Sequence, residues 1–528
     1  MDEVDYIVVG GGSAGCAAAG RLAERRRDRI LLIEAGGSDK TLPILMPAAT
    51  YLYALGNPRY DYRYESDPDP TRNNRVDYLP RGRVLGGTSS INGMLYVRGN
   101  PADYDEWASM GCKGWDFASL LPLFKRSENN ENGASELHGA GGHLSVSNLR
   151  VCHPLNRAFL EAAVASGMAR TDDINAIPQR GIGFAQTTSR RGVRVNAARA
   201  YLWWQSRNPF LNTELNCSVT KIVFAEGRAT GVIAGYGPLA RQIRAHKGVI
   251  LCAGAYASPQ LLMASGVGDG AHLRSLGISV VHHLPGVGQN LQEHPGVPIT
   301  ARVNVPTYNS QSTWLHKMWF GARWLLTGTG PGSSPDSHIV GFIEPDIRTR
   351  HGGYEFHFGP VGYEIDRNGA RLLPYPSATC FVNVSRPWSR GNVRLRSPDV
   401  DNQPLIQHNL LKDERDIVEL VAGARLLKRI LDTEPMLHSV VDILNYPKED
   451  SQAGWTHFLR SHAAGIYHPA GTCAMGHSPE SVVDDRLRVH GLENLYVADA
   501  SVMPLIISGN LNATCMVIGE KCAEMLSQ

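Results

Sequence analysis

The sequence predicts a mixed α/β protein (α+β overall), with one lobe on a parallel sheet and a second, interleaved lobe on an antiparallel sheet. Three observations lead to this prediction. Residues 7–35 read as strand, glycine turn, helix and strand, closed by an acid. Residues 249–268 repeat the order of strand, small-residue turn and helix. Between about residues 299 and 393 the apolar residues alternate with a period typical of β-strands.

The first of these stretches predicts a Rossmann-like nucleotide site. Gly10 permits the tight turn, Gly12 lets backbone N–H groups approach a pyrophosphate, and Gly15 lets the helix pack on the strand. Glu34 follows the second strand, where its carboxylate would accept hydrogen bonds from an adenosine ribose. The alternative is an ordinary glycine-rich turn, but the strand, the helix, the glycine spacing and the acid together favour a dinucleotide-binding site. Three neighbours join the predicted contacts: Ser13, Ala14 and Ala35.

Composition excludes several classes of function. With 50 Asp and Glu against 52 Lys and Arg, the net charge of +2 creates no global field that would mark nucleic acid or an anionic membrane as a partner. The nine cysteines lack metal-ligand spacing, and Cys16 and Cys252 fall in apolar segments that suit buried thiols, so no metal site is expected. The acidic residues 1–3 leave no room for a leader peptide, and no run is long enough for a transmembrane segment. A cytoplasmic protein is expected.

The chain order predicts interleaved lobes. The nucleotide lobe is expected to comprise residues 1–150, 190–298 and 461–528, and the substrate lobe residues 299–460. Within the first of these, the Pro-rich, aromatic stretch 36–78 suits a lid or an access wall. Helices are expected near residues 103–107, 120–125, 195–202, 414–431 and 513–526; strands are expected near 217–220, 223–236, 242–251 and 495–498.

Three segments together resemble a known family. They are RVLGGTSSINGMLYVRG from Arg83, GAYASPQLLMASGVG from Gly254, and IYHPAGTCAMG from Ile466 with the later ADASVMPLIISGNLNATCMVIGEK. They are similar to signatures of the glucose–methanol–choline oxidoreductases, flavoproteins that oxidise alcohols with FAD. The resemblance runs from residue 4 to 527, and the sequence is similar to the bacterial choline-dehydrogenase-like branch, which includes alcohol dehydrogenases and oxidases.

The resemblance implies roles for particular residues. His468 matches the family's catalytic base and Asn512 its second catalytic position, which is His or Asn, where an amide would hydrogen-bond the substrate oxygen. Histidines 282, 283, 294, 357 and 462 receive no role. The implied contacts to FAD, beyond those of the first motif, are Val84, Gly86, Gly87, Ser89, Asn92, Gly93, Met94, Val219, Tyr467, Asp499 and Ala500.

Two departures from the family pattern refine the expectation. Ile91 stands where choline-oxidising relatives carry the histidine that binds flavin covalently, so non-covalent FAD is expected. His338 stands where many members have a glutamate, which makes choline an unexpected substrate unless Asp336 or Glu364 supplies the anion. Trp314, Trp319 and Trp324 are interpreted as core residues in preference to pocket residues.

The expected reaction is oxidation of a primary alcohol to the aldehyde, with electrons passing to oxygen or a quinone-type acceptor. A lyase that keeps FAD only as structure and a non-catalytic flavin-binding protein remain alternatives. The sequence does not choose the alcohol, the acceptor or the oligomeric state.

Overall fold

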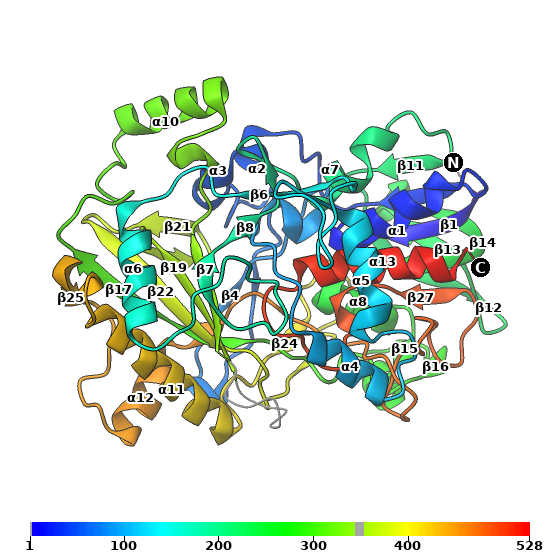
Figure 1. Ribbon diagram of the computed structural model, residues 1–528. Helices are drawn as coiled ribbons and strands as arrows, with labels where there is room; N and C mark the ends of the chain where they lie inside the picture. The colour runs from blue at the N-terminus through cyan, green and yellow to red at the C-terminus, as the bar shows by residue number, and fades with distance from the viewer. Residues whose placement is uncertain (1–2, 344–352, 528) are drawn as a thin grey trace.

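A seven-stranded sheet forms the core of one lobe in the computed structural model, which describes residues 3–343 and 353–527 (Figure 1). Its order is β11-β2-β1-β14-β13-β12, and β27 also pairs with β14. The pairs β11/β2, β2/β1, β1/β14 and β14/β27 are parallel, whereas β12, β13 and β14 form an antiparallel meander. The strands are β1 (Glu3–Val9), β2 (Ile30–Ile33), β11 (Leu211–Glu214), β12 (Val219–Ala225), β13 (Arg228–Ala234), β14 (Arg241–Leu251) and β27 (Leu495–Val497).

Two helices from opposite ends of the chain pack against each other in this lobe, α1 (Ser13–Glu24) and α13 (Asn512–Met525), drawn blue and red in Figure 1. The approach is close because Gly519 has no side chain: a Cβ there would lie 2.2 Å from the Ala14 carbonyl oxygen. The C-terminal helix therefore fixes the helix that follows the nucleotide turn.

The second lobe is built on another seven-stranded sheet, and its described pairs are all antiparallel. The order is β25-β17-β22-β19-β18-β7, with β26 also on β17. Helices α6 (Pro154–Ala165) and α11 (Glu414–Leu431) pack on it through buried apolar side chains. The strands are β7 (Gly181–Phe184), β17 (Pro295–Val303), β18 (Ile339–Ile343), β19 (Tyr354–Gly359), β22 (Ser377–Val384), β25 (Val440–Ile443) and β26 (Ala464–Gly465).

One helix lies within residues 299–393, where β-like alternation interleaved with three tryptophans and a loop was expected. It is α10 (Trp314–Thr327), which begins at the Thr313 cap and ends at Gly328 with φ +66°. The core interpretation is confirmed for Trp324, which is 7% exposed, but it is wrong for Trp314 and Trp319, which are 67% and 64% exposed. Spacing of apolar residues alone could not reveal which face this helix leaves uncovered.

The remaining elements link or cover the two sheets. The helices are α2 (Leu42–Leu45), α3 (Pro47–Tyr53), α4 (Pro101–Ser109), α5 (Phe117–Ser127), α7 (Ala197–Tyr201), α8 (Gly254–Ala264), α9 (Gly270–Ser275) and α12 (Gln452–His462). The short strands are β3 (Tyr64–Glu65), β4 (Tyr78–Leu79), β5 (Glu128–Asn130), β6 (Leu144–Asn148), β8 (Gln186–Thr187), β9 (Ser189–Arg190), β10 (Val193–Arg194), β15 (Val267–Gly268), β16 (His282–His283), β20 (Tyr363–Asp366), β21 (Gly369–Leu372), β23 (Asn392–Arg394) and β24 (Leu405–Gln407).

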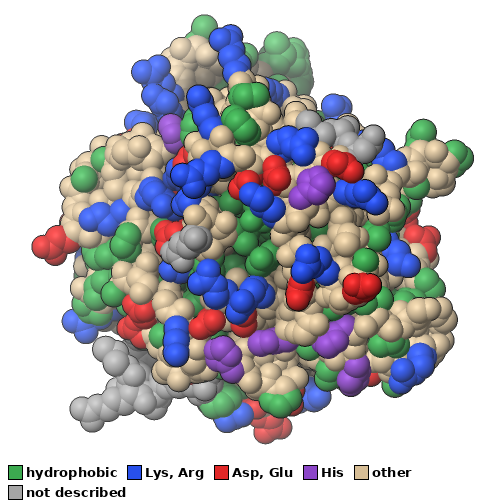
Figure 2. All heavy atoms as spheres, turned by 90° about the vertical axis from the view of Figure 1, so that its right-hand side faces the viewer, with side chains coloured by type: hydrophobic (Ala, Val, Ile, Leu, Met, Phe, Trp, Pro, Cys, Tyr) green, Lys and Arg blue, Asp and Glu red, His purple; other side chains and the backbone are tan. Residues whose placement is uncertain are grey.

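The surface charges and the cysteines are distributed as in an ordinary globular protein without disulfides. Positive and negative side chains are interspersed on the face shown in Figure 2. All nine cysteines are unpaired, and the predicted burial of Cys16 and Cys252 is confirmed. Over residues 3–343 and 353–527, none of the helices could cross a membrane, and no group of three or more His, Cys, Asp or Glu could hold a metal ion.

Candidate active site

Three turns from distant parts of the sequence meet at the carboxyl ends of the parallel strands. The Gly86 N–H donates to the Gly11 carbonyl at 2.7 Å, which joins the second glycine turn to the first. The turn after β14 adjoins both, because a Cβ on Gly10 would lie 2.6 Å from the Cys252 carbonyl oxygen. This edge of a parallel sheet is where α/β proteins bind nucleotides.

The start of α1 offers backbone N–H groups without a side-chain cap. Gly12 is the N-cap residue and makes no capping hydrogen bond, and a Cβ there would meet no atom closer than 3.8 Å. Around it the chain is tight: a Cβ on Gly15 would lie 1.9 Å from the Gly10 oxygen, and one on Gly87 would lie 2.7 Å from the Gly12 Cα. The turn is therefore rigid, and its open side suits a phosphate group.

Glu34 lies at the end of β2 as a buried acid. Its Oε2 accepts from the Gly11 N–H and its Oε1 from the Gly36 N–H, both at 2.8 Å. Burial raises the pKa of Glu34 to about 7, against the effect of these hydrogen bonds. The Cys217 N–H donates to the Glu34 carbonyl at 3.0 Å, which brings the start of β12, with Val219, beside the acid.

Asp499 ties the C-terminal segment to this edge. Its Oδ2 accepts from the Gly254 N–H at 2.8 Å and from Ser258 Oγ at 2.5 Å, and its Oδ1 accepts from the Ser501 N–H at 2.8 Å. The Ser501 hydroxyl oxygen is buried without a hydrogen-bond partner. A buried polar atom left in this state is a feature that a polar ligand would satisfy.

The segment Asn92–Met94 leads from the second turn toward the other lobe. Asn92 Oδ1 accepts from Arg194 Nη1 at 2.9 Å, and Met94 adopts the left-handed conformation with φ +62°. Such a conformation costs a non-glycine residue energy, so the surrounding contacts must hold it. Ile91, just before this segment, is 2% exposed and carries no group that could bond a flavin.

The side chains of His468 and Asn512, the predicted catalytic pair, contact different neighbours. The Ser13 hydroxyl donates to Asn512 Oδ1 at 2.8 Å, which directs this amide toward the phosphate turn. The amide that contacts His468 belongs to Asn510, whose Nδ2 lies 3.2 Å from His468 Nε2. Asn512 is the first residue of α13 whereas Asn510 precedes the helix, so the two side chains point to different neighbours.

Two backbone contacts fix the position of His468, which follows β26. Its N–H donates to Glu293 Oε1 at 2.7 Å, and Tyr467 before it adopts φ +71° while its carbonyl accepts from Arg81 Nη2 at 2.7 Å. Its ring makes a third contact, because its Nδ1 lies 3.0 Å from Nδ1 of His294. Burial raises the pKa of Glu293 to about 7.

The hydrogen bonds of the two rings determine their tautomers. The Ile507 carbonyl can only accept, so His294 Nε2, at 3.0 Å from it, carries a proton. In a neutral His294 the Nδ1 is then an acceptor, and His468 must donate to it from its own Nδ1. The lone pair of His468 Nε2 is left facing the Asn510 amide, as a base requires.

Burial and nearby charge keep His468 unprotonated. Burial lowers the pKa of His468 well below the ordinary histidine value, and His294, His357 and Arg81 lower it further. Glu355, 3.3 Å from His357, raises the pKa of His357 against the effect of burial. The arrangement therefore provides a neutral imidazole with a free nitrogen at neutral pH.

These residues fit a dinucleotide cofactor with a base beside it, and comparisons with known proteins decide the family. Two models of the GMC oxidoreductase family match residues 4–296 and 387–519. The chain belongs to the GMC oxidoreductase family. It is therefore an oxidoreductase that acts on CH–OH groups, and FAD is the cofactor expected of the family.

Related GMC oxidoreductases align over nearly the whole chain. Oxygen-dependent choline dehydrogenase from Cronobacter sakazakii is 40% identical and aligns with 99% of this chain and 94% of its own. The enzyme of that name from Klebsiella pneumoniae is also 40% identical, with shares of 99% and 96%. Among solved structures, pyridoxine 4-oxidase from Mesorbium loti (TM-score 0.88, 28% identity) covers 98% of both chains. An Aspergillus oryzae formate oxidase variant (TM-score 0.93, 26% identity) covers 100% of this chain and 98% of its own.

Three residues of this GMC site were missed from sequence: Glu293, His294 and Asn510. The first two stand in the run Gln292–Pro295, where a second His-Pro pair resembles the His468-Pro469 pair. That repetition is a signal that could have indicated a second site histidine. Asn510 and Asn512 are two residues apart, and only the start of α13 separates their directions.

An apolar cavity of about 340 Å³ lies between α3, α10 and the β20/β21 hairpin. Asp336 lines it together with Tyr363, whose hydroxyl donates to Asp336 Oδ2 at 3.1 Å. A Cβ on Gly93 would lie 3.1 Å from both Asp336 Oδ1 and the Tyr51 hydroxyl. The cavity therefore adjoins Asn92–Met94, the predicted flavin segment. The apolar lining includes Leu42, Met46, Leu52, Phe320, Val361 and Leu372.

His338, which replaces the family's glutamate, and the two candidate anions for a cationic substrate, Asp336 and Glu364, differ in position. Burial lowers the pKa of His338 to about 4, and its ring contacts Asn156 and Ser334, so it is neutral and bound within the protein. Glu364 is exposed and paired with Arg371. Asp336 is the acid that reaches the cavity wall.

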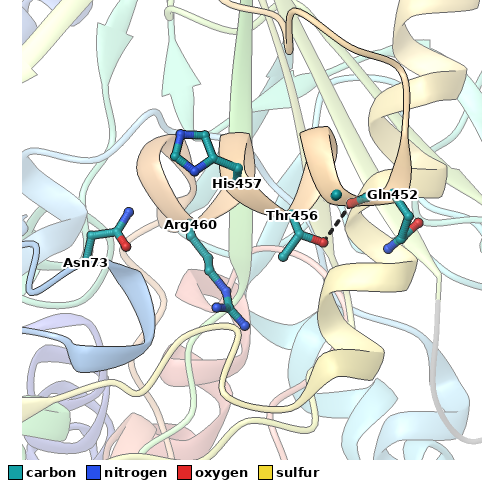
Figure 3. A pocket seen from close by; sticks show the side chains of 6 residues that line it. Asn73, Gln452, Thr456, His457 and Arg460 are labelled. Carbon is teal, nitrogen blue, oxygen red and sulfur yellow. Dashed lines mark hydrogen bonds between the residues drawn. The ribbon is translucent and has the colours of Figure 1, made fainter.

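A second hollow, of about 560 Å³, lies on the outer face of α12 (Figure 3). Its labelled side chains are Asn73, Gln452, Thr456, His457 and Arg460, and they point in different directions. The hydrogen bond drawn runs from the Thr456 hydroxyl to the Gln452 carbonyl at 2.8 Å, within one helical turn. We assign no ligand to this hollow.

Proposed function

We propose that the protein oxidises a primary alcohol with an apolar body to the aldehyde, with non-covalently bound FAD. FAD, when bound, supplies the acceptor for the hydride that leaves the carbinol carbon. The observation that carries the proposal is the contact of His468 Nε2 with the Asn510 amide, and the apolar cavity that adjoins Gly93 supports the apolar body of the substrate.

Asn510 and His468 have different roles at the substrate oxygen. An alcohol oxygen between them would accept from Asn510 Nδ2 and donate its proton to His468 Nε2, replacing their direct contact of 3.2 Å. The buried Asn510 Oδ1 has no partner of its own, so this amide is free to adjust toward a ligand. His294 accepts from Nδ1 of His468 and so keeps the His468 Nε2 directed at the substrate oxygen.

The cofactor residues are proposed from the same edge of the sheet. The uncapped start of α1, with Gly12, Ser13 and Ala14, would hold the pyrophosphate, and Glu34 the ribose. Asn92–Met94 and Tyr467 would border the flavin. The attachment is proposed to be non-covalent because Ile91 offers no nucleophile. We place the enzyme in the cytoplasm because its nine cysteines are unpaired.

The cavity supports an apolar substrate more than choline, because most of its lining is hydrocarbon. Asp336 is its nearest carboxylate, but Tyr363 donates to it. Choline, aromatic alcohols and long-chain alcohols should therefore be tested side by side as substrates. Each alcohol is tested once with oxygen alone and once with an artificial electron acceptor under argon.

The test is anaerobic bleaching of the flavin absorbance by each alcohol. We expect bleaching by an aromatic or long-chain alcohol and a rate roughly 100- to 10,000-fold lower in His468→Ala. His457→Ala, an exposed histidine on α12, is the matched control and should react as the wild type does. If none of the alcohols bleaches the flavin, a lyase that keeps FAD only as structure or a non-catalytic flavin-binding protein would be favoured. Acid precipitation should release the yellow colour into the supernatant; colour retained in the pellet would contradict non-covalent attachment.

A further inference from the structure

Helix α10 presents large apolar side chains to solvent. It projects from the body of the second lobe at the upper left of Figure 1. Six of its fourteen residues are apolar and between 62% and 85% exposed: Trp314, Leu315, Met318, Trp319, Leu325 and Leu326. A contiguous apolar patch of this kind marks an interaction surface in a folded protein.

The exposed residues share one face of the helix, and the opposite face holds it to the protein. Leu315, Trp319 and Leu326 recur at spacings of four and seven, which places them on one side. Trp324 lies on the other side, is 7% exposed, and donates from Nε1 to the Gly192 carbonyl at 2.6 Å. The helix is therefore attached along one side only, and its apolar side has no partner among the described residues.

The charges around this face are positive. The helix contains Lys317 and Arg323 and no acidic residue. Its C-terminal end adjoins the loop of Arg190 and Arg191, because a Cβ on Gly328 would lie 2.2 Å from the Arg191 carbonyl oxygen. Within residues 3–343 and 353–527, none of these four cations is paired with a carboxylate, so an anionic partner would meet no like charge on the helix.

The apolar cavity lies beside the other side of α10, the side that carries Trp324. Phe320 and Gly321 of α10 line it, as do Leu42 and Tyr53, which are 56% and 53% exposed. Its inner wall carries Asp336, beside the predicted flavin segment. The cavity rim therefore adds two exposed apolar side chains, Leu42 and Tyr53, in the region next to α10.

We propose that α10 lies in the interfacial region of an anionic lipid bilayer, with its apolar face toward the acyl chains. Helices with Trp and Leu on one side and cations at the flanks bind membranes in this way, buried about 5–10 Å. An anionic bilayer fits this face better than a second copy of the chain, because a second copy would bring the same cations against Lys317 and Arg323. A lipid-soluble reactant would then enter from the membrane; this last step rests on the proposed function, and the docking does not.

The test uses the FAD-loaded enzyme and sedimentation with vesicles. We expect binding to vesicles of phosphatidylglycerol and phosphatidylcholine, weaker binding to phosphatidylcholine alone, and a further loss with added salt. Leu315→Glu/Leu326→Glu should lower the partition coefficient at least tenfold. Leu239→Glu is the matched control, since Leu239 is 83% exposed in the other lobe and should leave binding unchanged. Equal sedimentation of the double variant, or no binding by the wild type, would overturn the proposal.

Two further measurements distinguish other outcomes. Brominated lipids should quench tryptophan fluorescence less in a Trp314→Phe/Trp319→Phe variant than in the wild type; equal quenching would place the contact elsewhere. If ultracentrifugation without lipid finds a dimer that the double Glu variant abolishes, the face binds a second copy and the membrane proposal is wrong.

The flavin of the double Glu variant should still be bleached by a water-soluble alcohol. Failure of the proposed function would instead remove bleaching from the wild type and leave vesicle binding intact.

Discussion

The imidazole rings of His294 and His468 meet at 3.0 Å between their Nδ1 atoms, with their planes at 89°. The His294 ring is buried and the His468 ring is half-buried, and the Ile507 carbonyl fixes the proton of the first and hence the tautomer of the second. A base whose free nitrogen is set by a second histidine is a more specific arrangement than a lone histidine in a pocket. Its consequences can be measured separately from those of Asn510, Asn512 and the nucleotide turn.

The two asparagines should separate into different roles. Asn510→Ala removes the amide at His468 and should lower kcat/KM about 10- to 100-fold, as expected for loss of one polar contact to the reacting oxygen. Asn512→Ala removes the partner of Ser13 and should weaken FAD retention on desalting, with a smaller effect on bleaching by the reloaded enzyme. The opposite pattern would return the catalytic role to Asn512.

His294 should act as a positioning residue with a pH signature. Because burial and nearby groups lower the pKa of His468, the acid limb of kcat/KM in the wild type should lie below pH 6.5. His294→Ala should lower kcat by about tenfold and move that limb to higher pH, since His294 is one of the groups that lower the pKa. His294→Gln offers a carbonyl acceptor and should recover part of the rate. Unchanged profiles in both variants would remove His294 from the site.

Gly15 should tolerate no side chain. In Gly15→Ala the Cβ would lie 1.9 Å from the Gly10 carbonyl oxygen, so α1 must move away from the turn. We expect a loss of about 1–3 kcal/mol in the free energy of unfolding by urea, together with loss of bound FAD. Gly141→Ala serves as the control, because no atom lies within 4 Å of its Cβ position. Equal stability of the two variants would contradict the close packing.

A buried ionic cluster in the nucleotide lobe should make stability depend on pH. His138 contacts Glu128 at 2.8 Å and Asp173 at 3.0 Å. Burial would lower the pKa of His138, but the hydrogen bonds to Asp173 and Glu128 outweigh it and raise the pKa to about 9. The stabilisation is therefore complete below about pH 6.5, the unfolded value, and lost as the pH rises through 9.

His138→Gln should accordingly destabilise the protein more at pH 6 than at pH 10, by about 1–3 kcal/mol in the difference between the two pH values. Urea unfolding at both values measures it. His457→Gln, on the exposed face of α12, should produce no such difference. A destabilisation by His138→Gln that is equal at both pH values would assign His138 a packing role only.

The sequence alone determined the nucleotide turn and the family, because those depend on local rules: glycines where a Cβ cannot fit, an acid at the end of a strand, and periodic apolar residues. It also predicted α11 and α13 nearly to the residue. The tertiary structure decided which side chains meet. His294 and His468 are 174 residues apart, and Asn510 and Asn512 differ only in where a helix starts. The exposure of Trp314 and Trp319 was decided in the same way, since burial depends on what packs against a helix and not on its own pattern.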